Sequence, residues 1–231
     1  MFQKPNKHKR LKQAASLRTA RERGLAVGSV IDVGVQRGTS ALIEVFPDKP
    51  HLLFEPVAEF LPDIARAYRH IDHDLFELAL SDVDGEGFLQ SGSHSGGGVT
   101  HAWVSSRGTP IRLARLDTIV GSSSRAGPYL LKIDVDGADA PAKIIDGAVA
   151  IMPSVSCIVS EMVAERFLDL AGRIERHGFV LWDIVEGSYY DDVFYQCDAV
   201  FIRRDLIAAN PGLKPFSMAS FDQRKWWSSC D

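Results

Sequence analysis

The stretch Ser29-Val-Ile-Asp-Val-Gly-Val-Gln-Arg-Gly38 indicates the fold class of this protein. Its first five residues form a short apolar run, which is typical of a buried parallel strand. Two glycines, Gly34 and Gly38, follow that strand, and residues 38–46 then have the pattern of a helix. Glycine allows positive φ and a close approach of the backbone to a ligand. This strand, turn and helix therefore predict an α/β unit with a ligand site at the carboxyl end of its strand.

Strands and helices alternate along the chain beyond this unit. Further strands are expected at residues 52–54, 75–80, 111–116, 129–134 and 155–160, and further helices at residues 7–23, 59–68, 140–151 and 164–177. The alternation from residue 29 to about 185 predicts a doubly wound, mostly parallel α/β sheet. The last two strands, at residues 179–185 and 199–203, are joined without a helix. We therefore expect an antiparallel hairpin at the C-terminal edge of the sheet.

The composition of the 231 residues, 45% hydrophobic and 24% charged, is that of one globular domain. We expect this domain at residues 24–206, between a basic N-terminal arm (1–23) and a C-terminal tail (207–231). No apolar run reaches the length of about 18 residues that predicts a membrane span, and no apolar run follows the basic start as it would in a secretory signal. Three widely spaced cysteines indicate reduced thiols. Together these features predict a cytoplasmic protein.

The net charge of −4 is unevenly distributed along the chain. The arm holds eight cationic residues and one acidic residue, so it carries +7 and the remainder carries −11. This distribution excludes a uniformly basic nucleic-acid binder. It leaves open whether the arm docks on the acidic body, pairs subunits in a homo-oligomer or contacts a polyanion.

Acidic side chains follow most of the predicted strands. They are Asp32, Glu55, Asp82 with the neighbouring Ser81, Asp134 and Glu161. Helix capping explains some acids at such positions. Because ligands bind at the carboxyl ends of the strands in doubly wound sheets, acids at so many strand ends also indicate a ligand site.

The turn after the first strand favours a cationic ligand without a phosphate group. A dinucleotide site would have the pattern Gly-x-Gly-x-x-Gly, which receives a pyrophosphate. Here the middle glycine is absent and Asp32 precedes the turn. S-adenosylmethionine, which carries an ammonium and a sulfonium, is a ligand of the expected kind. Glu55, at the end of the next strand, suits a carboxylate that accepts hydrogen bonds from both ribose hydroxyls.

Five motifs occur together in one order along the chain. They are Val30-Ile-Asp-Val-Gly34, Phe54-Glu-Pro-Val57, Ala79-Leu-Ser-Asp82 with Asp84-Gly-Glu86, Arg115-Leu-Asp117, and Leu131-Lys-Ile-Asp-Val-Asp-Gly-Ala-Asp139. In this order and spacing, residues 30–161 resemble FkbM-type S-adenosylmethionine-dependent methyltransferases. The family's Asp-Val-Glu-Gly-Ala-Glu is changed here, since both glutamates are replaced by the shorter Asp136 and Asp139. The resemblance implies a Rossmann-like class I methyltransferase fold and methylation of a hydroxyl on a sugar, glycan or other small molecule.

The resemblance also implies roles for individual residues. Asp32, Gly34 and Gly38 would line the methionine and adenosine side of the cofactor, Glu55 would hold the ribose, and Ser81 and Asp82 would flank the adenine. Asp134 would lie beside the methyl-transfer centre. An alcohol nucleophile needs a group that removes its proton. The candidates are Asp134, Asp136, Glu161 and His94, the last in the glycine-rich loop expected at residues 91–98.

Other side chains have simpler interpretations. Lys132, in a buried strand, is expected to pair with an acid. The stretch His70-Ile-Asp-His-Asp74 resembles a metal cluster but lies at a helix exit, away from the strand ends, so we expect no metal site there.

Two other functions are compatible with the sequence. One is RNA methylation, with the basic arm as the nucleic-acid contact. However, Asp134-Val-Asp-Gly does not match the Asn/Asp-Pro-Pro-Tyr/Phe tetrapeptide of many base N-methyltransferases. The other is a non-catalytic interaction module with a methyltransferase-like fold, although the intact glycine turn and Glu55 argue against it.

Overall fold

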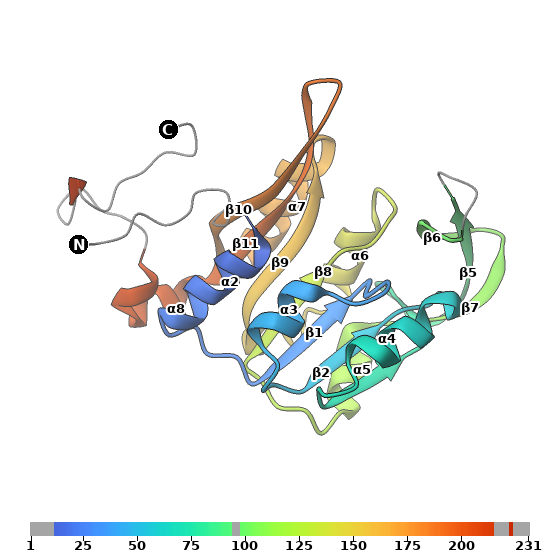
Figure 1. Cartoon of the computed structure of the whole chain (residues 1–231), viewed down its shortest axis with the longest axis horizontal. Helices are drawn as coiled ribbons and strands as arrows, with labels where there is room; N and C mark the ends of the chain where they lie inside the picture. Colours follow the sequence, from blue (N-terminus) through green and yellow to red (C-terminus); the bar gives the residue numbers. More distant parts are fainter. Residues whose placement is uncertain (1–11, 94–97, 215–221, 224–231) are drawn as a thin grey trace.

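The computed structural model describes residues 12–93, 98–214 and 222–223. Its main sheet has seven strands in the order β10-β11-β9-β8-β1-β2-β3 (Figure 1). The strands are β1 Ser29–Val33, β2 His51–Phe54, β3 His73–Phe76, β8 Tyr129–Ile133, β9 Val155–Val163, β10 Phe179–Tyr190 and β11 Val193–Arg203. β11 is antiparallel to both of its neighbours, whereas all other pairs are parallel. The predicted Rossmann-like class I fold, with an antiparallel hairpin at its edge, is confirmed.

Helices cover both faces of this sheet because successive residues of the buried strands point to opposite sides. In β1, Ile31 and Val33 pack under α5, α6 and α7, while Val30 packs under α2, α3 and α8. Helix α4 covers the β2 end of that second face. The helices are α2 Gln13–Glu22, α3 Ser40–Val45, α4 Leu61–Ala67, α5 Leu116–Ser122, α6 Ala140–Asp146, α7 Phe167–Arg176 and α8 Arg204–Ala209, with short 3-10 turns η1 Ala58–Phe60, η2 Met152–Ser154, η3 Ala164–Arg166 and η4 Pro211–Leu213.

The described part of the basic arm is built into the core. Helix α2 buries Leu17 and Ala20 completely, against α3 and β11. Burial of a leucine side chain contributes about 1.5–3 kcal/mol, so α2 is anchored by packing rather than by charge. Its cations also pair with the body, since Lys12, Arg18 and Arg21 form ion pairs with acids of β10, α3 and the loop after α3. The helix begins later than predicted, and residues 1–11 lie outside the described residues.

A second, four-stranded sheet corrects the prediction for the middle of the chain. The strand expected at residues 75–80 is two strands, β3 and β4, which belong to different sheets. The second sheet has the order β4-β7-β5-β6, with β4 Ala79–Leu80, β5 Gly85–Gly92, β6 His101–Ser105 and β7 Thr109–Ala114. Its glycine-rich strand β5 includes Ser91 and Gly92, which the sequence places in a loop, because pairing with β6 and β7 overrides their weak strand propensity.

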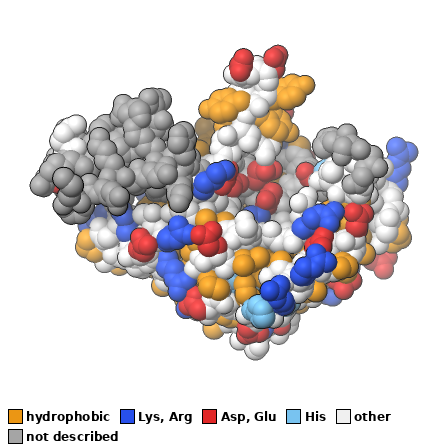
Figure 2. Space-filling model, viewed as in Figure 1, with side chains coloured by type: hydrophobic (Ala, Val, Ile, Leu, Met, Phe, Trp, Pro, Cys, Tyr) orange, Lys and Arg blue, Asp and Glu red, His pale blue; other side chains and the backbone are white. Residues whose placement is uncertain are grey.

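Two projections flank the carboxyl ends of the central strands. The β10–β11 hairpin rises on one side and the β5–β6 pair on the other, with α6 between them (Figure 1). The space-filling view shows a hollow between the two projections in which acidic side chains gather (Figure 2). Among the described helices, none has the length and apolar character needed to cross a bilayer.

Candidate active site

A cavity of about 630 Å³ lies at the carboxyl ends of β1, β2, β8 and β9. The turn after β1, the residues after β2, strand β6, the loop after β8 and strands β9 and β11 form its walls. Its volume lies within the range of about 300–1,000 Å³ typical of small-molecule sites.

The turn after β1 depends on its glycines. Gly34 and Gly38 have φ values of +80° and +130°, which side-chain-bearing residues rarely adopt. A Cβ atom at Gly34 would lie 1.8 Å from the carbonyl oxygen of Asp134, so only glycine lets the ends of β1 and β8 approach this closely. Both glycines line the cavity, as the sequence predicts.

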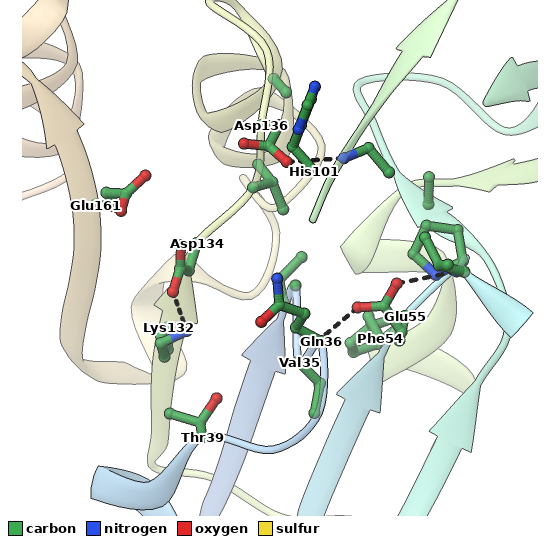
Figure 3. Close-up of a pocket in the computed structure, with 18 of the residues that line it drawn as sticks. Val35, Gln36, Thr39, Phe54, Glu55, His101, Lys132, Asp134, Asp136 and Glu161 are labelled. Atoms are coloured by element: carbon green, nitrogen blue, oxygen red, sulfur yellow. Dashed lines mark hydrogen bonds and ion pairs between the residues drawn. The ribbon is translucent and has the colours of Figure 1, made fainter. Parts of the chain in front are cut away.

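Glu55 is fixed by the backbone around it. Its side chain accepts hydrogen bonds from the N–H groups of Gln36 (2.7 Å) and Val57 (2.9 Å), one on each carboxylate oxygen (Figure 3). The residue is only 4% exposed, and this burial raises the pKa of the carboxyl while the two N–H groups oppose the rise. Because each carboxylate oxygen has a second lone pair, Glu55 can still accept hydrogen bonds from a ligand's hydroxyl groups.

Asp32 lies beneath the cavity rather than in its wall, unlike the prediction. It is completely buried and is not among the lining residues. The hydroxyl of Tyr68 donates to its Oδ2 atom (3.0 Å), and the Nζ atom of Lys132 lies 3.7 Å from its Oδ1 atom. Tyr68 in turn accepts a hydrogen bond from the N–H of Thr39, in the turn after β1. Asp32 therefore supports the cavity floor from below.

Lys132 links that buried acid to the cavity. Its ammonium donates to the Oδ2 atom of Asp134 (2.8 Å), so the expected pairing with an acid is confirmed (Figure 3). Burial would lower the pKa of Lys132, but the carboxylates of Asp32 and Asp134 more than offset this effect and raise it. The side chain of Asp134 is 43% exposed and lines the cavity. The ammonium of Lys132 thus orients Asp134 in the wall of the cavity.

Glu161 and Asp198 face each other on the neighbouring strands β9 and β11. Burial, assisted by the negative charges of Asp134 and Asp198, raises the pKa of Glu161 to about 7. Burial and the charge of Asp134 raise the pKa of Asp198 to about 6. Glu161 lies within β9, which extends to Val163, and not beyond the end of the strand as predicted.

Two glutamines complete this part of the site. The side-chain amide of Gln196 donates to the Oε2 atom of Glu161 (2.6 Å), and that of Gln13 donates to the Oδ2 atom of Asp198 (2.8 Å). Gln13, Gln196 and Asp198 are not among the site residues that the sequence predicts. An acid directly before the apolar residues 199–202 was the available signal for Asp198, whereas nothing in the sequence connects α2 with β11.

Strand β6 supplies the wall opposite Glu161. The N–H of Ala102 donates to the Oδ2 atom of Asp136 (2.8 Å), which ties β6 to the loop after β8 (Figure 3). The rings of His101 and Trp103, both cavity-lining, stack with their centroids 5.4 Å apart. His94, the predicted loop base, lies outside the described residues. His101 is therefore the histidine that lines the cavity among the described residues.

Ser81 and Asp82 lie just outside the cavity. The preceding residues 78–80 line it, but these two do not. The hydroxyl of Ser81 donates to the Oδ1 atom of Asp82 (2.9 Å). A Cβ atom at Gly147 would meet the carbonyl oxygen of Ser81 at 2.1 Å, so the pair is packed against the end of α6.

In the acid- and histidine-rich segment 70–74, the two aspartates pair with an arginine. Arg125 donates to the carboxylates of both Asp72 and Asp74, at 2.8 and 2.7 Å. In the described part of the chain, no group of three or more His, Cys, Asp or Glu side chains is arranged to hold a metal ion.

Comparison with known proteins gives matches to solved structures only, since no family model and no curated protein matches the chain. A TehB-like SAM-dependent methyltransferase from Corynebacterium glutamicum is 12% identical with a TM-score of 0.40, over 81% of this chain and 86% of that one. The N-methyltransferase NodS from Bradyrhizobium japonicum is 9% identical with a TM-score of 0.48, over 86% and 98%. Fibrillarin from Aeropyrum pernix, with natively bound S-adenosyl-L-methionine, is 13% identical with a TM-score of 0.45, over 80% and 76%. The fold assignment itself rests on the strand order and pairing of the seven-stranded sheet.

Proposed function

We propose that this protein is an S-adenosylmethionine-dependent methyltransferase of the FkbM type that methylates a hydroxyl group on a sugar, glycan or other small molecule. The observation that carries the proposal is the position of Glu55. Its carboxylate lies at the end of β2, beside the glycine turn, and lines a cavity of about 630 Å³. A carboxylate at this point of a doubly wound sheet is suited to the two hydroxyls of a ribose.

The residues around Glu55 fit the rest of this cofactor. The turn with Gly34 and Gly38 lines the cavity beside Glu55, and no phosphate-binding glycine pattern is present. Carboxylates of Asp134 and Asp136 line the cavity further from Glu55 and suit a cationic ligand. When bound, S-adenosylmethionine supplies a methyl group that its positively charged sulfur makes electrophilic.

Glu161 is the proposed general base. As an acceptor hydroxyl takes up the methyl group, Glu161 would accept the proton that this hydroxyl loses. A base whose pKa is about 7 is well matched to proton transfer near neutral pH. Lys132 keeps Asp134 oriented toward the same space, and the walls position the two reactants, which supplies much of the rate enhancement in such displacements.

The two alternative functions gain no support. Of the four described cations of the basic arm, Lys12, Arg18 and Arg21 are paired with acids of the domain instead of forming a free basic surface for RNA. The fourth, Arg23, donates to the carbonyl oxygen of Gly212. A non-catalytic module would not require paired, partly protonated carboxylates in its cavity.

Calorimetric titration with S-adenosylhomocysteine tests the cofactor site. Replacement Glu55→Ala should weaken binding at least about tenfold, because it removes two charge-assisted hydrogen bonds to the ribose. Glu44→Ala on α3, which removes an exposed carboxylate outside the cavity, is the matched control and should bind normally. Equal affinity of the Glu55→Ala variant and the wild type would overturn the assignment. Methyl transfer from labelled cofactor to sugars, glycolipids, polyketides and RNA then identifies the acceptor class.

A further inference from the structure

Two acid–amide pairs form one end of the cavity. Gln196 donates to Glu161 and Gln13 donates to Asp198, and all four side chains line the same cavity. They come from three elements, namely α2, β9 and β11. Figure 3 shows Glu161 across the cavity from Glu55, so this end is separate from the proposed ribose site. We call Gln13, Glu161, Gln196 and Asp198 the acceptor end.

The hydrogen bonds within the acceptor end determine which atoms remain for a ligand. A carboxylate only accepts hydrogen bonds, so each glutamine must present its NH₂ group to the acid and turn its oxygen away. Among the described residues, no group donates to the Oε1 atoms of Gln13, Gln196 and Glu161 or to the Oδ1 atom of Asp198. Gln13 is only 5% exposed, and its side chain lines the cavity. The acceptor end therefore offers four acceptor atoms to a ligand in the cavity.

The charge of the acceptor end is also uncompensated. Within the described chain, no lysine or arginine forms an ion pair with Glu161 or Asp198. The nearest cation, Lys132, is already shared between Asp32 and Asp134. Asp136, which also lines the cavity, adds further negative charge, whereas the charge of Glu186 is balanced by Lys12. Carboxylates this close disfavour each other's ionised form, and a bound cation would remove that cost.

Among common ligand groups, one supplies both hydrogen-bond donors for these acceptor atoms and a positive charge for these carboxylates. A hydroxyl is donor and acceptor at once and has no charge, whereas an ammonium has three donors, no acceptor and a positive charge. We propose that the methyl acceptor carries a protonated amine, which the acceptor end binds through Asp198, Glu161 and the amide oxygens of Gln13 and Gln196. This inference rests on the proposed function. The ammonium would also favour the ionised form of Glu161, which is the form that takes the hydroxyl proton.

Binding of three matched sugars tests the inference without turnover. The full chain is saturated with S-adenosylhomocysteine and titrated with galactosamine, N-acetylgalactosamine and galactose. Galactosamine should bind at least about tenfold more tightly than the two neutral sugars, the ratio expected for charge-assisted hydrogen bonds. Equal binding of the three, tighter binding of a neutral sugar or no measurable binding of galactosamine would each overturn it. Failure to bind S-adenosylhomocysteine would instead count against the proposed function.

Charge-removing variants test whether the acceptor end causes the preference for galactosamine. Asp198→Asn keeps the shape of the side chain and should abolish the preference for galactosamine over galactose while S-adenosylhomocysteine still binds. Asp192→Asn, at the exposed turn between β10 and β11, makes the same chemical change outside the cavity and should keep the preference. If Asp198→Asn fails to fold, Gln13→Leu removes an amide oxygen of the same site. A preference that survives both Asp198→Asn and Gln13→Leu would contradict the assignment.

Discussion

The two ends of the cavity are built in different ways. At the proposed cofactor end, which comprises Glu55 and the glycine turn, Glu55 is held by main-chain N–H groups of Gln36 and Val57, and the turn is shaped by glycine φ angles. At the acceptor end, side chains hold side chains, and Gln13 and Asp198 are 185 residues apart in the chain. Backbone geometry tolerates few changes, whereas side-chain pairs can change without altering the fold. The acceptor end is therefore where this protein can acquire its own specificity.

The variant Glu161→Gln should show the largest difference between the two ends, because it should slow methyl transfer and leave cofactor affinity unchanged. Loss of a general base lowers the methyl-transfer rate by about 10²–10⁴-fold, while the cofactor end, across the cavity, is untouched. Single-turnover rates with labelled cofactor and calorimetry with S-adenosylhomocysteine measure the two effects. A parallel loss of cofactor affinity would show that the ends do not act independently.

The variant Lys132→Met tests the floor of the cavity, where Lys132 contacts Asp32 and Asp134 and neither end of the cavity. It would leave Asp32 as an unpaired buried charge, which costs about 3–5 kcal/mol of unfolding free energy. Urea unfolding measures the loss, and the double variant Lys132→Met/Asp32→Asn should recover most of it. Lys143→Met, at an exposed position of α6, is the control. Unchanged stability of Lys132→Met would mean that the buried Asp32 does not depend on the charge of Lys132.

The pH dependence of stability should report the acceptor end alone. The pKa of Glu161 is raised from 4.5 to about 7, so the folded protein holds this proton more tightly than the unfolded chain. Its stabilising contribution is present below about pH 4.5 and is lost as the pH rises through about 7. The unfolding free energy of the wild type should therefore fall by about 1–3 kcal/mol relative to that of Glu161→Gln between pH 5 and pH 8. Parallel pH profiles of the two proteins would contradict this.

Sequence reasoning was most reliable where structure is local. The buried run 29–33, the glycine turn and Glu55 lie within a short segment, and their pattern predicted the parallel sheet and the cavity at its edge. It was least reliable where pairing partners are distant. The four-stranded sheet was missed because β5 contains three glycines at positions 85, 87 and 92 and takes its strand form from β6 and β7.

The sequence by itself determined the alternation of strands and helices, the positive-φ turn and the carboxylates at the strand ends, because periodicity and glycine act through neighbouring residues. Only the tertiary structure decided what each carboxylate does. Burial places Asp32 beneath the floor and not in the wall. Antiparallel pairing of β9 with β11 brings Asp198 opposite Glu161, and the packing of Leu17 carries Gln13 to Asp198. Desolvation and the repulsion between charges depend on distances in space, which the order of residues does not contain.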